Sequence, residues 1–172
     1  TIKKVDFDQA RDRILLGVER KGMVLTEADK KILAYHEAGH AIVAKMLPEA
    51  DPIHKITIIP RGRAMGQTQQ LPLGDRYAYG RRYLVDQITV LLGGRAAEKL
   101  VFNEFTTRIE SDLVQATELA TNIVCRWGMS ENLGPKAYAV DRGGFLDNSA
   151  QRLSMSGETA DLIDREVKQL LS

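Results

Sequence analysis

The chain has 172 residues, enough for one ordinary domain that buries a hydrophobic core without disulfides. Its formal net charge is only +1, so it lacks the positive charge that is typical of a nucleic-acid binder. No apolar run approaches the roughly 20 residues that span a bilayer, and the single cysteine, Cys125, excludes a metal cage built from several cysteines. These features predict a soluble globular domain. Because the chain begins with Thr1 rather than Met, we expect it to be part of a longer protein.

Two helices are predicted in the first third of the chain. The first covers residues 7–19, is capped by Asp6 and carries apolar residues at helical spacing. The second covers residues 27–47, with Thr26 and Asp29 as a capping pair at its start and a proline directly after its end. The apolar stripe of the first helix consists of Ala10, Ile14, Leu15 and Val18.

The middle of the chain predicts a small sheet followed by a long helical stretch. Residues 53–59 are rich in β-branched side chains, and residues 65–71 can form a second strand that pairs with the first after a turn. Helical residues follow over 81–92 and 95–102, with Gly93-Gly94 between them. Each of these glycines costs a helix roughly 1 kcal/mol relative to alanine. Two explanations stay open: a close contact with another helix, or a joint between two helices.

The last part of the chain is again helical. A helix is predicted over residues 112–127, with Ser111 as its cap and Gly128 at its end. A short strand over 138–140 follows, and Ser156 opens a final helix whose amphipathic pattern continues to the last residue. We therefore expect a mainly α (α+β) fold, in which a helical domain carries a small β-sheet and further helix follows beyond the chain.

Residues 36–40 read His-Glu-Ala-Gly-His, the pattern H-E-x-x-H, on the second predicted helix. Residues four apart on a helix differ by about 40°, so both imidazoles leave one face and can bind one Zn²⁺ at roughly 2.0–2.1 Å. Glu37 lies about 100° around the helix, where it reaches a water on the metal rather than the metal itself. Gly39 removes a side chain beside the site, which indicates that another element or a substrate backbone comes close. The pattern predicts a catalytic zinc site at His36, Glu37 and His40.

A catalytic zinc has three protein ligands, and local sequence does not identify the third. The extended metzincin pattern would need glycine at 43 and histidine at 46, but the chain has Val43 and Met46. His54 is expected to be a hydrogen-bonded structural histidine rather than a ligand. Glu98 and Asp112 are the better candidates, and the residues alone do not decide between them.

The zinc pattern is accompanied by further segments in a fixed order along the chain. They are AYHEAGHA at 34–41, KITIIPRG at 55–62, LLGGRAAE at 91–98, TT at 106–107, SDL at 111–113, WGMS at 127–130 and LGP at 133–135. Together they resemble the peptidase domain, of the M41 type, of the FtsH family of membrane-anchored, ATP-dependent zinc proteases. The likeness runs over essentially the whole chain.

This resemblance implies a role for each site residue that matches the family pattern. His36 and His40 would be zinc ligands and Glu37 the general base. Asp112 aligns with the family's third ligand, so Glu98 would hold the helix joint or support a ligand histidine instead.

The resemblance also implies the setting in which the domain works. Residues 1–22 would be the C-terminal end of an AAA+ module or its linker, and residues 23–172 the zinc metallopeptidase domain. The family forms homo-hexamers that degrade unfolded or misassembled membrane and soluble proteins, and ATP would act only through the ATPase module missing from this chain. The parent protein would be anchored in the bacterial inner membrane with its protease domain in the cytoplasm. No nucleic-acid partner is expected.

The sequence departs from the family pattern just before Asp112. Arg108 and Ile109 stand where the family usually has Gly-Ala, and Ser111 stands where asparagine is common. Replacing a loop glycine by arginine changes the backbone path if that glycine used a positive φ. An alternative function follows from this departure: a catalytically weak domain that serves mainly as an oligomerisation platform for the ATPase ring.

Overall fold

The computed structural model describes residues 2–20, 22–62, 64–138 and 156–172. The chain divides into two compact units, Thr1–Asp75 with Gly93–Thr107 and Arg76–Leu92 with Arg108–Ser172. In the described parts the regular structure is mainly helical with a two-stranded antiparallel sheet, which confirms the predicted fold class.

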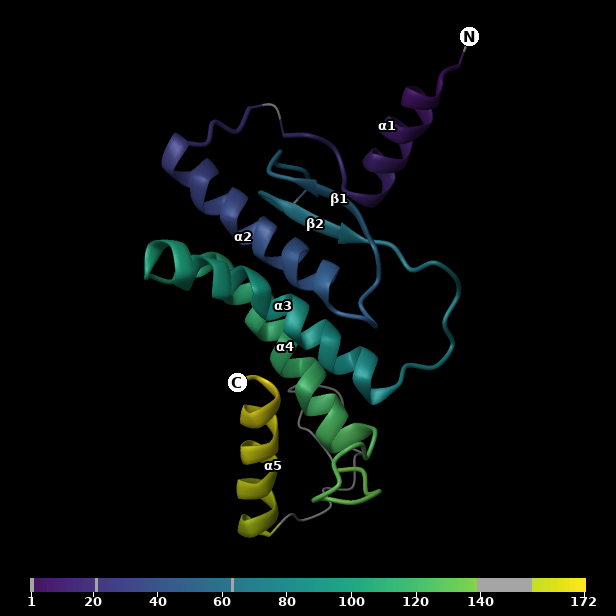
Figure 1. Cartoon of the computed structure of the whole chain (residues 1–172), viewed down its shortest axis with the longest axis vertical. Helices are drawn as coiled ribbons and strands as arrows, with labels where there is room; N and C mark the ends of the chain where they lie inside the picture. The colour runs from purple at the N-terminus through teal and green to yellow at the C-terminus, as the bar shows by residue number, and fades with distance from the viewer. Residues whose placement is uncertain (1, 21, 63, 139–155) are drawn as a thin grey trace, which may run out of the picture. The chain divides into compact units, whose positions relative to one another are not determined.

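The elements are α1 (Lys4–Leu15), α2 (Glu27–Met46), β1 (Ile53–Thr57), β2 (Gln67–Gln70), α3 (Arg81–Phe102), the 3₁₀ turn η1 (Thr107–Ile109), α4 (Glu110–Thr121), the π-helical turn η2 (Asn122–Arg126) and α5 (Gly157–Leu170) (Figure 1). The strand predicted over 138–140 extends outside the described residues.

Helix α1 differs from the prediction in its bounds and in the face it buries. Lys3 is the cap, and the Asp6 carboxylate lies inside the first turn, where it accepts the backbone N–H of Lys3 at 2.7 Å. The helix stops at Leu15 because Gly17 follows with a left-handed φ of +88°. The predicted apolar stripe is wrong: Ile14 is 82% exposed, whereas Asp12 is buried. Asp12 forms an ion pair with Lys55 of β1, so the covered face of α1 is the one that carries Asp12.

Helix α2 begins as its sequence predicts. The Thr26 hydroxyl accepts the N–H of Asp29 at 3.1 Å, and the Asp29 carboxylate accepts the N–H of Thr26 at 3.3 Å. Both strands contact this helix and lie along it in Figure 1. The antiparallel register places Ile56 opposite Thr68. The strands are shorter than predicted; β1 ends at Thr57, whose hydroxyl accepts the N–H of Ile59.

Helix α3 is continuous through Gly93-Gly94, so a joint between two helices is the wrong explanation and a close contact is the right one. A Cβ added to Gly39 would lie 2.4 Å from the carbonyl oxygen of Gly93, and a Cβ added to Gly93 would lie 2.8 Å from that of Gly39. The backbones of α2 and the second half of α3 therefore touch, which only glycine allows. The helix ends at Phe102 because Asn103 has a left-handed φ of 54°.

The second unit packs its helices around a core of its own. Helix α4 starts at Glu110, slightly before the predicted Ser111 cap, and the helical stretch ends after η2, where Gly128 has a φ of +59°. Ser156 caps α5 as predicted, and its hydroxyl accepts the N–H of Thr159. The core comprises Leu84, Ile88, Ala116, Ala120 and Ile123, against which Val167, Leu170 and Leu171 pack. The apolar face of the final helix is thus partly covered within its own unit. Among the described residues, no helix combines the length and apolar character needed to cross a membrane.

Candidate metal centre

Helix α2 carries His36 and His40 one turn apart on a buried face, as predicted. Their Nε2 atoms lie 3.1 Å apart, and the ring planes stand at 80° to each other. Two nitrogens bound tetrahedrally to one zinc at roughly 2.0–2.1 Å would lie about 3.3 Å apart. The two Nε2 atoms therefore already have nearly the separation that a shared zinc requires.

The space around these nitrogens depends on a glycine of α3. A Cβ added to Gly94 would lie 2.6 Å from Cε1 of His36 and 2.6 Å from Nε2 of His40. The two adjacent glycines thus act differently: Gly93 admits the backbone of α2, and Gly94 leaves room for the converging imidazoles. The sequence pointed to a close contact here but gave no sign of this second role.

Glu98 lies on the opposite side of the His36 ring. Its Oε1 is 2.8 Å from Nδ1 of His36, and its side chain is fully buried. The same carboxylate accepts the backbone N–H of Thr106 at 2.7 Å and its hydroxyl at 3.2 Å. A carboxylate bound to Nδ1 fixes the tautomer and orientation of the ring and leaves Nε2 for a metal. This geometry favours a role for Glu98 in supporting His36 over a role as a metal ligand. The hydrogen bonds that Thr106 donates to Glu98 were not predicted.

Glu37 is 4% exposed and extends from α2 toward β2. The hydroxyl of Thr68 lies 2.9 Å from Oε2 of Glu37 and 2.9 Å from its backbone carbonyl oxygen. The carboxylate thus leaves the helix at a different angle from the two imidazoles, as the sequence predicts. The contact with Thr68 was not predicted. We call His36, Glu37, His40 and Glu98 the histidine cluster.

Asp112 lies half-buried in the first turn of α4. Asp112 belongs to the second unit, whereas the two histidines belong to the first. Its role as the third ligand of a shared metal therefore stays a prediction. The residues that depart from the family pattern take ordinary backbone conformations: Arg108 and Ile109 form the turn η1, and Ile109 has a φ of −68°. Among the described non-glycine residues, Asn103 alone has a positive φ. Arginine at 108 therefore introduces no backbone strain.

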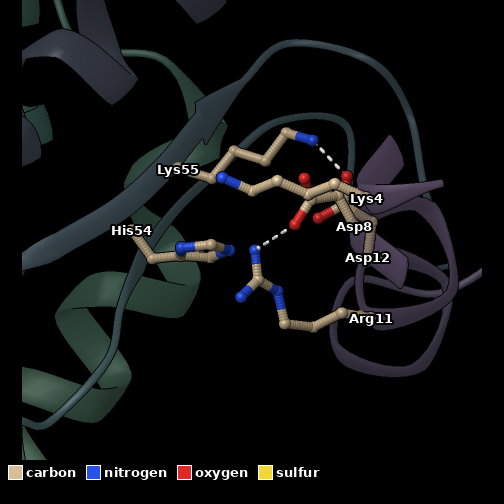
Figure 2. Close-up of a pocket in the computed structure, with 6 residues that line it drawn as sticks. All are labelled: Lys4, Asp8, Arg11, Asp12, His54 and Lys55. Atoms are coloured by element: carbon tan, nitrogen blue, oxygen red, sulfur yellow. Dashed lines mark hydrogen bonds and ion pairs between the residues drawn. The ribbon is translucent and has the colours of Figure 1, made fainter. Parts of the chain in front are cut away.

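His54 lies in another part of the first unit, in an open pocket between α1 and β1 (Figure 2). Its Nε2 is buried and has no hydrogen-bond partner among the described residues, so the prediction of a fully hydrogen-bonded histidine is wrong for this atom. The hydrogen bond from Lys55, outweighing the opposing effect of desolvation, holds the pKa of the Asp12 carboxyl below its usual value. We call this group the charged pocket; its lining residues are Lys4, Asp8, Arg11, Asp12, His54 and Lys55.

Comparison with known proteins identifies the family of the chain. The profile of peptidase family M41 matches residues 23–172. The ATP-dependent zinc metalloprotease FtsH of Syntrophotalea carbinolica is 51% identical, with 96% of this chain and 26% of that protein covered. The proteins of the same name from Pseudothermotoga lettingae and Caulobacter vibrioides are 50% and 48% identical, with 99% and 96% of this chain and 28% and 27% of those proteins covered.

The chain thus spans about a quarter of the length of these curated relatives. The family profile, in contrast, covers most of the chain, and the identity to each of these relatives is close to one half. The chain therefore belongs to peptidase family M41.

Proposed function

We propose that this peptidase domain is a zinc endopeptidase whose metal is held by His36, His40 and Asp112. The observation that carries the proposal is the pair of Nε2 atoms 3.1 Å apart, with Glu98 behind one ring and Gly94 leaving space beside both. This donor set suits a catalytic zinc, because two imidazoles and one carboxylate leave a fourth position open. The assignment of Asp112 rests on its match to the family's ligand segment. The relatives are named zinc metalloproteases, which supports the choice of metal.

Glu37 is the general base in this proposal. Zinc, when bound, lowers the pKa of water to about 7 and polarises the scissile carbonyl. Glu37 removes a proton from the attacking water and later gives it to the leaving amine. Its burial next to the ligands excludes bulk water from this carboxylate, and its exit angle from α2 keeps it off the metal. Glu98 keeps the His36 ring oriented through both steps.

The substrates we infer are unfolded or misassembled polypeptides, from membrane and soluble proteins. An extended peptide can pair with the edge of β2 that β1 does not use, which binds backbone irrespective of side chains. The relatives are named ATP-dependent enzymes. We accordingly propose that residues 1–22 connect this domain to an ATPase module, in a homo-hexamer anchored in a bacterial inner membrane with the protease domain in the cytoplasm.

The decisive experiment replaces Glu37 with glutamine in the ATPase-linked protein. We expect casein cleavage to fall by on the order of 10²- to 10⁴-fold, because the amide cannot take a proton, while one zinc per chain is retained. A chelator should abolish cleavage by the parent protein, and added zinc should restore it. Retained proteolysis in zinc-loaded E37Q would contradict the role of Glu37. A chain that forms rings without zinc and without cleavage would instead support the oligomerisation platform.

A further inference from the structure

The carboxylate of Glu37 is held from outside its own helix by strand β2. The Thr68 hydroxyl lies 2.9 Å from Oε2 of Glu37 and equally close to the backbone carbonyl oxygen of the same residue. A hydroxyl has one hydrogen, so the two acceptors share it or take it in turn. Both contacts tie Thr68 to the residue that the proposed function makes the general base.

A second observation on the same segment concerns the other carboxylate oxygen. A Cβ added to Gly66 would lie 2.9 Å from Oε1 of Glu37 and 3.1 Å from Cγ and Cδ1 of Leu33. Leu33 is a core residue of α2 and is 1% exposed, so it has little room to move. The segment therefore omits a side chain where Oε1 lies and supplies a hydroxyl where Oε2 lies.

The strand that carries the hydroxyl also fixes its position. Thr68 is β-branched and pairs with Ile56 in the antiparallel ladder, which restricts both its backbone and its χ1 angle. Glutamate has three rotatable side-chain bonds and can adopt many rotamers when nothing holds it. A rigid donor that contacts a flexible acceptor selects one of these rotamers.

We propose that Thr68 is a positioning residue that holds the Glu37 carboxylate in its proton-accepting orientation, with Gly66 keeping the space for it. This inference rests on the proposed function, because it assigns Glu37 the role of base. Thr68 acts through the Glu37 carboxylate rather than on the substrate. Its loss therefore lowers the rate of the chemical step and leaves peptide binding and zinc binding intact.

The test compares T68V, which keeps the shape but lacks the donor, with T68S, which keeps the hydroxyl, in the zinc-loaded ATPase-linked protein. We expect T68V to lower kcat by roughly 10- to 100-fold with KM changed less than about twofold, because small displacements of a reacting group have effects of this size. T68S should stay within about threefold of the parent protein. G66A should lower kcat in the same way as T68V, because its Cβ displaces Oε1.

The matched control is T57V, which removes a threonine hydroxyl from the neighbouring strand, where it accepts the N–H of Ile59. This control should keep the parent kcat. Zinc content and thermal midpoint are measured for every variant, and a crystal structure of T68V should show the Glu37 carboxylate in more than one rotamer. If T68V does not fold, T68S and G66A carry the test.

Two results would overturn the inference: an unchanged kcat in T68V, or equal losses in T68V and T68S. Either result combined with an inactive E37Q would reject the role of Thr68 alone. A fully active, zinc-loaded E37Q would reject the proposed base itself, and with it the reason for positioning it.

Discussion

The first unit contains two groups of ionisable side chains that differ in how they are held. In the histidine cluster, His36 and Glu37 are nearly inaccessible, and Glu98 is fully buried. In the charged pocket, the Asp8 and Arg11 side chains are each 47% exposed and pair with each other across one helical turn (Figure 2). Both groups contain a histidine, carboxylates and close contacts. The histidine cluster is held in addition by the backbone N–H of Thr106, and Gly94 leaves space for its imidazoles.

This difference has an energetic meaning. An exposed ion pair contributes about 0–1 kcal/mol, because water solvates both charges almost as well as they solvate each other. A buried carboxylate is costly unless its acceptors are used, and Glu98 uses them on His36 and Thr106. The residue type alone therefore does not indicate a functional site. A better indication is the number of structural elements that hold the side chain in place.

The largest effect is expected from Gly39→Ala, which tests whether the helix contact holds the histidine cluster together. The new Cβ would meet the carbonyl of Gly93 at 2.4 Å and Cβ of Ala97 at 2.7 Å. Backbone atoms cannot move aside as a flexible side chain can, so the helices must separate. We expect a loss of about 3 kcal/mol in the free energy of unfolding, measured by urea denaturation, together with weaker zinc binding.

Gly157→Ala is the control for this substitution. Gly157 also lies in a helix, and nothing comes within 4 Å of an added Cβ there. Alanine at 157 should leave the stability unchanged or raise it slightly, because alanine favours helix. If alanine at 39 proved equally harmless, the close approach of α2 and α3 would be refuted.

A smaller effect is expected from Glu98→Gln, which keeps the shape of the side chain but leaves one acceptor oxygen in place of two. Nδ1 of His36 and the N–H of Thr106 reach different oxygens of Glu98, so the amide nitrogen would take the place of one of these two acceptors. Since the orientation of His36 then loses its support, we expect the zinc dissociation constant to rise roughly 10- to 100-fold, measured by competition with a chelating dye. Glu104→Gln, at an exposed position of the same unit, should have no effect. Unchanged zinc affinity in E98Q would show that His36 needs no support from Glu98.

The histidine cluster could be predicted in part, because part of it is local. His36, Glu37 and His40 lie within five residues of one helix, and Thr26 marks where that helix begins. Their partners are distant along the chain: Glu98 is 62 residues from His36, and Thr68 is 31 residues from Glu37. Helical periodicity carries no information about contacts over such separations, so these partners appear only in the folded chain.

The predicted apolar stripe of α1 is wrong for the same reason, because the contact that covers this helix is distant along the chain. Helical spacing of apolar residues predicted that Ile14 would be buried, but Ile14 is exposed and Asp12 is covered. Asp12 pairs with Lys55, 43 residues away, and helical spacing carries no information about such a contact. At Gly93-Gly94 the sequence predicted either a close helix contact or a joint between two helices. The continuous helix α3 and its close approach to α2 show that the first is right.

The smallest effect is expected from Asp12→Asn, which tests whether the charged pocket contributes to stability at all. The pKa of Asp12 is held below its usual value by the Lys55 hydrogen bond, so the folded chain binds this proton more weakly than the unfolded chain does. The stabilisation is therefore complete above the unfolded pKa of about 4 and is lost as the pH falls through the lower folded pKa. We expect D12N to cost about 0.5–1 kcal/mol at pH 7, less in high salt, and progressively less below about pH 4, measured by urea denaturation at each pH. Asp8→Asn, at the more exposed Arg11 pair, should cost less than D12N at pH 7. A D12N effect that stayed constant down to pH 3 would mean that the side chain acts by shape rather than by charge, and the contrast between the two clusters would then rest on packing alone.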